Sequence, residues 1–186
     1  MRSFTTERLL IRPLAEQDKE LYLSLYTDEK IMRHIGEPLS VEAAKNAFAR
    51  TMKAMRKEKP KTMTWAIVTL AGKKSIGIQA LSWQRPTFIH KQITPNINQA
   101  DIGIMLTSVS QGQRFPAESL NILIGYAFNK LDLDMITAYH SKKNLKSKRV
   151  FDKLGFIFDA KVQPENTNDC YRYLDKVSME KSDSKP

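Results

Sequence analysis

Residues 100–156 carry the strongest hydrophobic pattern in the chain, and it predicts two strands alternating with two helices. An apolar strand over residues 102–107 is followed by a turn over residues 110–115 and then by a helix. The apolar positions of this helix fall on one stripe: Leu120, Leu123, Ile124, Ala127, Phe128 and Leu131. Pro116 fits the first helical turn, where no intrahelical N–H is needed, and Glu118 suits the positive end of the helix dipole. We therefore expect this helix to begin at the turn and to pack flat on a sheet.

The second half of this stretch predicts a strand over residues 135–140 and a helix that opens at Asn144. Asn is a good N-cap residue, and Gly155 ends the helix because glycine takes the left-handed C-cap conformation without steric cost. Unpaired N–H groups and the positive dipole end attract phosphate at a helix N-terminus. A phosphate-bearing ligand at the turn over residues 110–115 is therefore the first hypothesis.

Weaker patterns predict the remaining elements. We expect strands over residues 8–14, 63–70, 75–83, 157–160 and 170–178. We expect helices over residues 16–26, 28–34 and 40–56. A short Gly-containing turn over residues 71–74 makes the two strands beside it an antiparallel pair. Residues 84–99 are polar and without periodicity, which predicts a long loop.

Composition places the chain among cytoplasmic single-domain proteins. Its 186 residues contain no low-complexity linker, so we expect one domain over residues 1–181 and a disordered polar tail over residues 182–186. A single cysteine excludes an internal disulfide. No apolar run approaches the ~20 residues that span a bilayer, and charges interrupt the first residues where a signal peptide would need an apolar core. We expect a cytoplasmic protein with no membrane partner.

The formal net charge of +10 is compatible with nucleic acid, an anionic cofactor or proximity to the ribosome. A solvated lysine-rich surface would give the same charge. No helix-turn-helix, zinc-finger or RNA-binding signature accompanies the basic clusters, so nucleic acid is not expected as the main partner.

Several short motifs occur in an order and spacing that resembles a known family. They are Asp101-Ile102-Gly103, Gln111-Gly112, Glu118, Asn144-x-x-Ser147 and Gly155-Phe156. Together they resemble the GNAT superfamily of acetyl-CoA-dependent N-acetyltransferases, and the N-terminal run Thr6-Glu7-Arg8-Leu9-Leu10-Ile11-Arg12 looks most like its RimJ/RimL branch. The resemblance implies an α/β (α+β) fold with a mixed, mostly antiparallel sheet and helices on both faces. It also implies that the strands over residues 102–107 and 135–140 are parallel and splay apart, with acetyl-CoA inserted between them.

The resemblance implies transfer of an acetyl group to a primary amine, and for this branch to a protein N-terminal α-amine such as that of a ribosomal protein. Two alternatives stay open: acetylation of a small amine such as a polyamine or an antibiotic, and binding of acyl-CoA without turnover. The loop over residues 84–99 is either a flap over the acceptor channel or an excursion without function. The oligomeric state is also open.

The resemblance assigns the cofactor to residues on one strand, the turn and the second helix. They are Ile104, Met105, Leu106, Gln111, Gly112, Gln113, Arg114, Phe115, Asn144 and Ser147. The family's phosphate fingerprint has glycine where this chain has Arg114, and Pro116 occupies its sixth position and has no N–H to donate. We expect Arg114 to give up the positive φ of glycine and to supply a guanidinium to the phosphates instead. The N–H groups of Gln111, Gly112, Gln113 and Phe115 should remain available, which predicts retained but altered CoA binding.

Catalytic groups follow from the same resemblance. Several family members use a Tyr on the second helix to protonate the departing thiolate, and Phe151 stands at that position here. Ser147 is the substitute acid that the resemblance suggests, or else a small residue that packs near the cofactor. Glu165 is the candidate base, in a region that also contains Asp159, although a carboxylate in a turn is more often only solvated. The three histidines show no triad or metal spacing, so no metal is expected.

Overall fold

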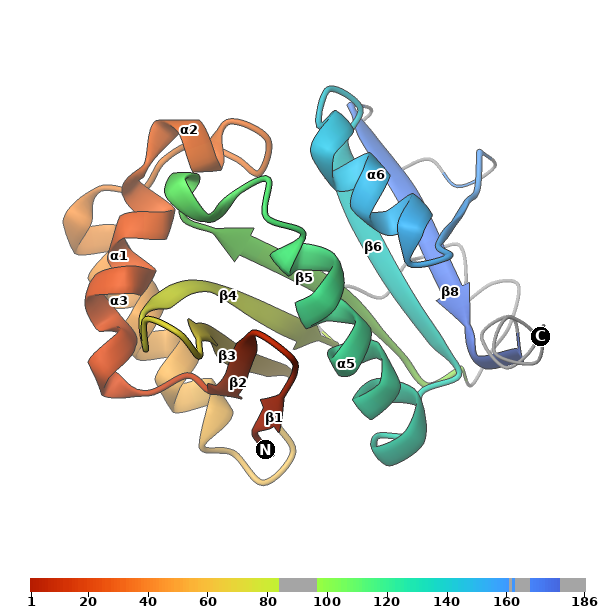
Figure 1. Cartoon of the computed structure of the whole chain (residues 1–186), viewed down its shortest axis with the longest axis horizontal. Coiled ribbons are helices and arrows are strands. Elements are labelled where there is room, and N and C mark those ends of the chain that lie inside the picture. The colour runs from red at the N-terminus through yellow and green to blue at the C-terminus, as the bar shows by residue number, and fades with distance from the viewer. Residues whose placement is uncertain (84–96, 161, 163–167, 178–186) are drawn as a thin grey trace.

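A computed structural model describes residues 1–83, 97–160, 162 and 168–177. Its strands form one sheet in the order β1-β2-β3-β4-β5-β6-β8-β7 (Figure 1). Their bounds are Phe4–Thr5, Leu9–Pro13, Thr62–Thr69, Ser75–Ser82, Gln99–Leu106 and Met135–Ser141 for β1 to β6, Ile157–Phe158 for β7 and Asp169–Asp175 for β8. Neighbouring strands run antiparallel except β5 and β6, which run parallel. The mixed, mostly antiparallel sheet predicted from the sequence is confirmed.

Helices cover both faces of the sheet. They are α1 (Lys19–Thr27), α2 (Glu29–Met32), α3 (Val41–Met55), α5 (Phe115–Lys130) and α6 (Leu145–Lys153), with short 3₁₀ turns η1 (Glu16–Asp18) and η2 (Ser108–Ser110). One face packs against α1 and α3 through a cluster that contains Tyr22, Leu25, Phe48 and Ile78. The opposite face packs against α5 and α6 through a larger cluster, which includes Leu120, Leu123, Phe128, Ile136 and Phe151. The predicted stripe of α5 therefore faces the sheet. No described helix combines the length and apolarity needed to cross a membrane.

The strands β5 and β6 diverge soon after they pair. Their register covers three residue pairs only, in which Gln99, Ala100 and Asp101 lie opposite Met135, Ile136 and Thr137. Figure 1 shows the gap between the two strands widening from this point toward the start of α6. We call the last pair, Asp101 and Thr137, the vertex. The expected splay of the two parallel strands is confirmed.

Gly77 lets β4 approach β5 closely on the other side. A Cβ atom at Gly77 would lie 2.3 Å from the Met105 carbonyl oxygen and 2.5 Å from Leu106 Cδ2. Backbone at that distance cannot give way, so only glycine fits opposite Leu106 in this register. The close approach holds β5 tightly against β4.

Several details of the sheet differ from the sequence-based expectations. The two-residue strand β1 was not predicted, and it pairs with β2 at the sheet edge. The strand predicted over residues 157–160 shortens to the two residues of β7, and the last strand ends at Asp175. Most of the loop predicted over residues 84–99 and the tail over residues 182–186 lie outside the described residues, and β5 begins at Gln99, inside the predicted loop and before the strand predicted from residue 102.

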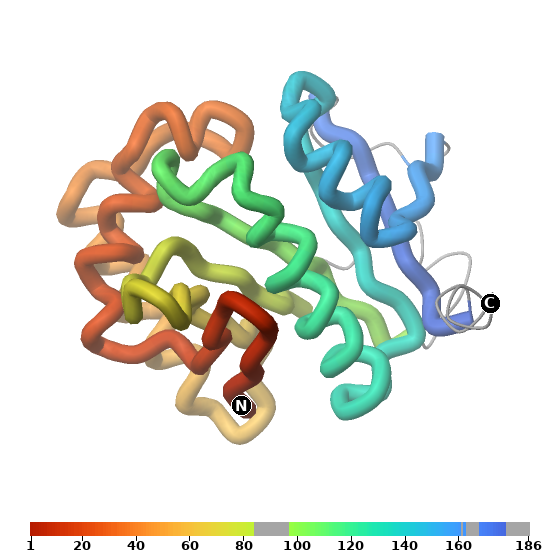
Figure 2. Tube along the Cα trace, in the orientation of Figure 1, coloured from red at the N-terminus to blue at the C-terminus, as the bar shows by residue number. Residues whose placement is uncertain are grey.

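The N-terminal segment lies beside the start of α5, as the tube in Figure 2 shows. Thr6 and Arg8 hydrogen-bond to Glu118, which is more than 100 residues away in sequence. This long-range contact brings the Thr6–Arg12 motif next to the predicted phosphate turn.

Candidate active site

The turn before α5 has the backbone shape of an anion site. Gly112 adopts φ 83° and Arg114, the N-cap of α5, adopts φ 62° and ψ 4°. The expectation that Arg114 gives up the positive φ of glycine is therefore wrong. The left-handed conformation costs a residue with a Cβ about 1–2 kcal/mol, so the turn keeps its shape under local strain.

Four consecutive N–H groups of this turn are free to bind a ligand. Among the described residues, the N–H groups of Gly112, Gln113, Arg114 and Phe115 donate no hydrogen bond. The N–H of Gln111, which we expected to be available, instead donates to the Ser108 carbonyl at 3.4 Å. The N–H of Arg114, which was not among those expected, replaces the N–H of Gln111 as the fourth unpaired donor. These donors lie at the N-terminus of a sixteen-residue helix, where the dipole also favours an anion.

The start of α6 forms the opposite side of the site. Asn144 caps α6 as expected, since its Oδ1 accepts the Ser147 N–H at 3.1 Å. Lys146 reaches back across the gap, and its Nζ donates to Gln111 Oε1 at 3.1 Å. The structure therefore brings Asn144 and Ser147 to the same region as the turn before α5, although about 30 residues separate them in the sequence.

The three predicted residues of β5 divide between the two faces of the sheet. Ile104 and Leu106 belong to the apolar cluster that includes α5, whereas Met105 packs against the cluster of α1 and α3. Their backbone lies beyond the vertex, where β6 no longer pairs with β5. This strand edge can therefore accept hydrogen bonds from, or donate them to, an extended ligand in the gap.

Ser147 and Phe151 occupy neighbouring turns on the same face of α6. Phe151 is 4% exposed and stacks on His140 with ring centroids 6.0 Å apart. Ser147 is half-buried, and its hydroxyl makes no hydrogen bond among the described residues. On this face of α6, Ser147 carries the hydroxyl group that lies nearest to Phe151 in the sequence.

His140 is buried and neutral beneath Phe151. Arg172 Nε donates to His140 Nε2 at 2.9 Å, which places the imidazole proton on Nδ1, 3.0 Å from the Ser141 carbonyl. Burial is the main cause that lowers the pKa of His140, and the nearby positive charge of Arg172 lowers it further. Arg172 is itself held by Asp152 Oδ1 at 2.8 Å. Sequence reasoning gave no role to this network, because its members are brought together by β6, α6 and β8.

The two carboxylates considered as a base are placed differently. Glu165 lies outside the described residues, so its role stays a prediction, and Asp159 is half-buried after β7. A third carboxylate, Asp101, accepts a hydrogen bond from Thr137 Oγ1 at the vertex. The sequence marked Asp101 only as part of a motif, because its partner lies 36 residues away. Among the described residues, no group of three or more His, Cys, Asp or Glu side chains is arranged as metal ligands would be.

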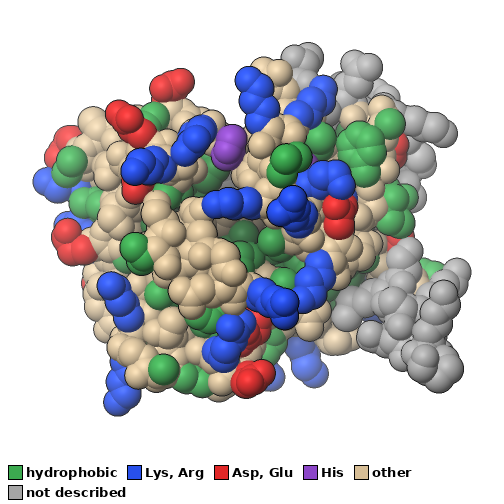
Figure 3. Space-filling model, turned by 45° about the horizontal axis from the view of Figure 1, so that its top comes forward, with side chains coloured by type: hydrophobic (Ala, Val, Ile, Leu, Met, Phe, Trp, Pro, Cys, Tyr) green, Lys and Arg blue, Asp and Glu red, His purple; other side chains and the backbone are tan. Residues whose placement is uncertain are grey.

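Positive charge surrounds the region between the turn and α6. Figure 3 shows Lys and Arg side chains around a hollow whose floor is partly hydrophobic. Exposed basic residues lie on the turn, just before α6 and on its first turns: Arg114, Lys142, Lys143, Lys146, Lys148 and Arg149. An apolar floor with a basic rim suits a ligand that has a long uncharged arm and a phosphorylated end.

The geometry agrees with the comparison to known protein families. A family model described as an acetyltransferase (GNAT) domain matches residues 8–157, which include the turn, α5, α6 and the splayed strands. This chain belongs to the GNAT acetyltransferase family. It is therefore an acyltransferase, and GNAT acetyltransferases use acetyl-CoA as the acetyl donor.

Individual relatives share the fold at low sequence identity. The uncharacterized N-acetyltransferase YoaA of Bacillus subtilis (strain 168) is 25% identical over 153 residues, which cover 81% of this chain and 80% of that protein. The spermidine N-acetyltransferase of Vibrio cholerae, solved with CoA and spermine, has a TM-score of 0.74 at 17% identity and covers 93% of this chain and 98% of its own. The ribosomal-protein-S5-alanine acetyltransferase of Vibrio fischeri has a TM-score of 0.71 at 18% identity and covers 100% of both chains. Similarities at this level establish the GNAT fold of this chain and leave its acceptor open.

Proposed function

We propose that this GNAT acetyltransferase belongs to the RimJ/RimL-like branch and acetylates a protein N-terminal α-amine, such as that of a ribosomal protein. The observation that supports this choice is that the residues at the expected acid position of α6 and beneath it do not offer a proton. At the position of the family's Tyr, α6 has the buried Phe151, and the imidazole that stacks on it is neutral and hydrogen-bonded at both nitrogens.

A site with so little acid-base assistance suits an acceptor that is already partly neutral. An α-amino group with a pKa near ~7.8 is roughly one-quarter neutral near pH 7.4, whereas a Lys side chain near ~10.4 is neutral in about one part in a thousand. General acid-base catalysis contributes roughly 10²- to 10⁴-fold, which is comparable to this difference in neutral amine. An N-terminal α-amine therefore needs the least help from this site.

We assign the roles of the residues as the resemblance to the family implies them, with Glu165 outside the described residues. Acetyl-CoA supplies the thioester. The N–H groups from Gly112 to Phe115 and the guanidinium of Arg114 hold its phosphates, and the backbone of Ile104, Met105 and Leu106 holds its extended arm together with Asn144. Ser147 donates a proton to the departing thiolate, and Glu165 accepts the proton of the amine.

Thiol release from acetyl-CoA with a panel of acceptors tests the proposal. The panel contains a ribosomal-protein N-terminal peptide, the same peptide with a blocked N-terminus and an internal Lys, spermidine, and an aminoglycoside. We expect the free N-terminal peptide to give the highest kcat/KM and the blocked peptide to be inactive. A higher kcat/KM for spermidine or for the aminoglycoside would replace the proposal with small-amine acetylation.

A further inference from the structure

Glu118 in the first turns of α5 binds the N-terminal segment through both carboxylate oxygens. Its Oε1 accepts from Thr6 Oγ1 at 2.5 Å and from the Arg8 N–H at 3.1 Å. Its Oε2 accepts from Arg8 Nε at 2.8 Å and from Arg8 Nη2 at 2.5 Å. Burial alone would raise the pKa of Glu118, but the hydrogen bonds from Thr6 and Arg8 outweigh burial and lower it. The carboxylate therefore stays ionised and keeps Arg8 in a fixed, bidentate geometry.

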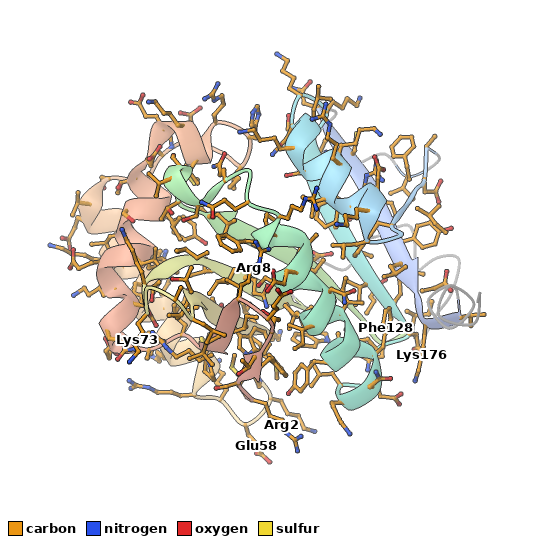
Figure 4. All side chains as sticks on the ribbon, viewed as in Figure 1. Arg2, Arg8, Glu58, Lys73, Phe128 and Lys176 are labelled. Carbon is orange, nitrogen blue, oxygen red and sulfur yellow. The ribbon has the colours of Figure 1, made fainter. Side chains whose placement is uncertain are left out.

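The third nitrogen of the same guanidinium reaches the phosphate turn. Arg8 Nη1 donates to the Gln113 carbonyl at 3.1 Å, and Arg8 Cζ lies 4.6 Å from the centre of the Phe115 ring. Figure 4 shows the labelled Arg8 between the N-terminal segment and the start of α5. Arg8 thus contacts the residue before and the residue after Arg114, the residue that adopts the strained positive φ.

The hydrogen bond from Arg8 to the Gln113 carbonyl fixes the direction of the Arg114 N–H group. The Gln113 carbonyl and the Arg114 N–H belong to one peptide group, which is planar and trans, so they point in opposite directions. Because the carbonyl points at Arg8, the Arg114 N–H points away from Arg8, and it donates no hydrogen bond among the described residues. Without this bond, the peptide group next to a strained residue would be free to rotate.

We propose that Arg8 is a positioning residue of the acetyl-CoA site: through Glu118 and the Gln113 carbonyl, it holds the phosphate turn with the Arg114 N–H aimed at the ligand. The proposal rests on the use of acetyl-CoA by this family. It gives Arg8 of the Thr6–Arg12 motif a function in cofactor binding, although Arg8 lies more than 100 residues before the turn. The planar fork of arginine is essential, because a lysine ammonium cannot bind the carboxylate bidentately while it also reaches Gln113.

The test compares Arg8→Lys with a matched control on the same segment. Arg12 forms an equivalent bidentate pair with Asp18, at 2.7 and 2.8 Å, but has no contact with the turn among the described residues. Arg8→Lys and Arg12→Lys therefore each weaken one Arg–carboxylate pair, and only the first also affects the turn. The measurements are kcat and KM for acetyl-CoA and for S-acetylpantetheine, which lacks the phosphates, together with the melting temperature.

We expect Arg8→Lys to raise the KM for acetyl-CoA at least fivefold, to leave kcat within twofold and to change kcat/KM for S-acetylpantetheine by less than twofold. Arg12→Lys should lower the melting temperature and leave the KM for acetyl-CoA unchanged. An equal loss with both donors, or an equal KM effect in both variants, would overturn the proposal and leave Arg8 a structural role only. A wild-type protein that fails to bind acetyl-CoA would instead contradict the family's activity in this chain, so the two failures are distinguishable.

Discussion

Arg114 combines strain and charge in one residue of the phosphate turn. Its positive φ of 62° is unfavourable for a side chain with a Cβ, whereas its exposed guanidinium adds a strong anion donor at the helix N-terminus. A turn with glycine at this position would have neither the strain nor the charge. The two effects act on different quantities, the free energy of unfolding and the affinity for acetyl-CoA.

Replacing Arg114 by Gly and by Ala separates these effects. Both variants lose the guanidinium, and a charge-assisted hydrogen bond is worth roughly 1.5–3 kcal/mol, so acetyl-CoA should bind at least tenfold more weakly in each. Only glycine relieves the strain, so Arg114→Gly should be about 0.5–1 kcal/mol more stable than Arg114→Ala. Calorimetric titration and urea unfolding measure the two quantities. Tighter binding by Arg114→Gly would show that Arg114 obstructs the site.

His140 should make the stability of the protein depend on pH in the weakly acidic range. Its pKa in the folded state lies below the value of about 6.5 expected in the unfolded chain. The unfolded state therefore binds more protons than the folded state. The stability that neutral His140 contributes is fully present above about pH 6.5, and it is lost as the pH falls through the folded-state pKa.

The variant His140→Gln keeps a neutral acceptor for Arg172 and removes the titration. We expect the wild-type free energy of unfolding to fall more steeply than that of His140→Gln between pH 7 and pH 5, by at most about 1.4 kcal/mol per pH unit. Urea unfolding at several pH values measures both slopes. Parallel slopes would mean that the pKa of His140 is the same in the folded and the unfolded protein, contrary to its burial and its hydrogen bond from Arg172.

At the scale of one element, α6 uses Asn144 in two ways that a pair of variants can distinguish. The Oδ1 atom caps the helix at Ser147, and the Nδ2 group remains a donor for a ligand. Asn144→Ala should cost about 1 kcal/mol of stability and should also weaken acetyl-CoA binding. Asn144→Asp keeps the capping oxygen but has no side-chain N–H donor, so the variant should keep the stability and still bind acetyl-CoA more weakly. Unchanged affinity in both variants would restrict Asn144 to the cap.

The helices were more predictable from the sequence than the order of the strands. The stripe from Leu120 to Leu131 and the caps of α6 are local signals, and the structure confirms both helices. The position of β8 between β6 and β7 depends on pairing between distant segments, which periodicity does not encode. The two-residue strand β1 is too short to show any period.

The candidate site was predictable where its residues follow one another in the sequence. The turn, the Asn144 cap and Ser147 were placed by motif and spacing. The Arg8–Glu118 pair, the Asp101–Thr137 pair and the His140–Arg172 pair join residues 32 to 110 positions apart, so no local pattern predicted them. The φ of Arg114 was also missed, because its neighbours hold a conformation that its own side chain disfavours.

For the molecule as a whole, acetyl-CoA should act as a stabiliser. A ligand that binds only the native state adds about 2.7 kcal/mol at a hundredfold excess over Kd. For a chain of this size, 1 kcal/mol corresponds to roughly 2–4 °C, so the melting temperature should rise by about 5–11 °C. Differential scanning fluorimetry measures the shift, and S-acetylpantetheine serves as the control without phosphates. No shift at millimolar acetyl-CoA would contradict binding at the basic hollow.

The three-pair register between β5 and β6 divides the sheet into a larger part, β1 to β5, and a smaller part, β6, β8 and β7. The larger part leads from β5 into the phosphate turn, and the smaller part leads from β6 into α6 with Asn144 and Ser147. One apolar cluster connects the two parts, since it contains Ile102 of β5, Leu120 of α5 and Ile136 of β6. At the open end of the gap, the Lys146–Gln111 hydrogen bond spans two exposed side chains and adds little stability. A ligand that contacts both the phosphate turn and the start of α6 would therefore join the two parts of the sheet on the side where β5 and β6 do not pair, and its binding should stiffen that side of the molecule.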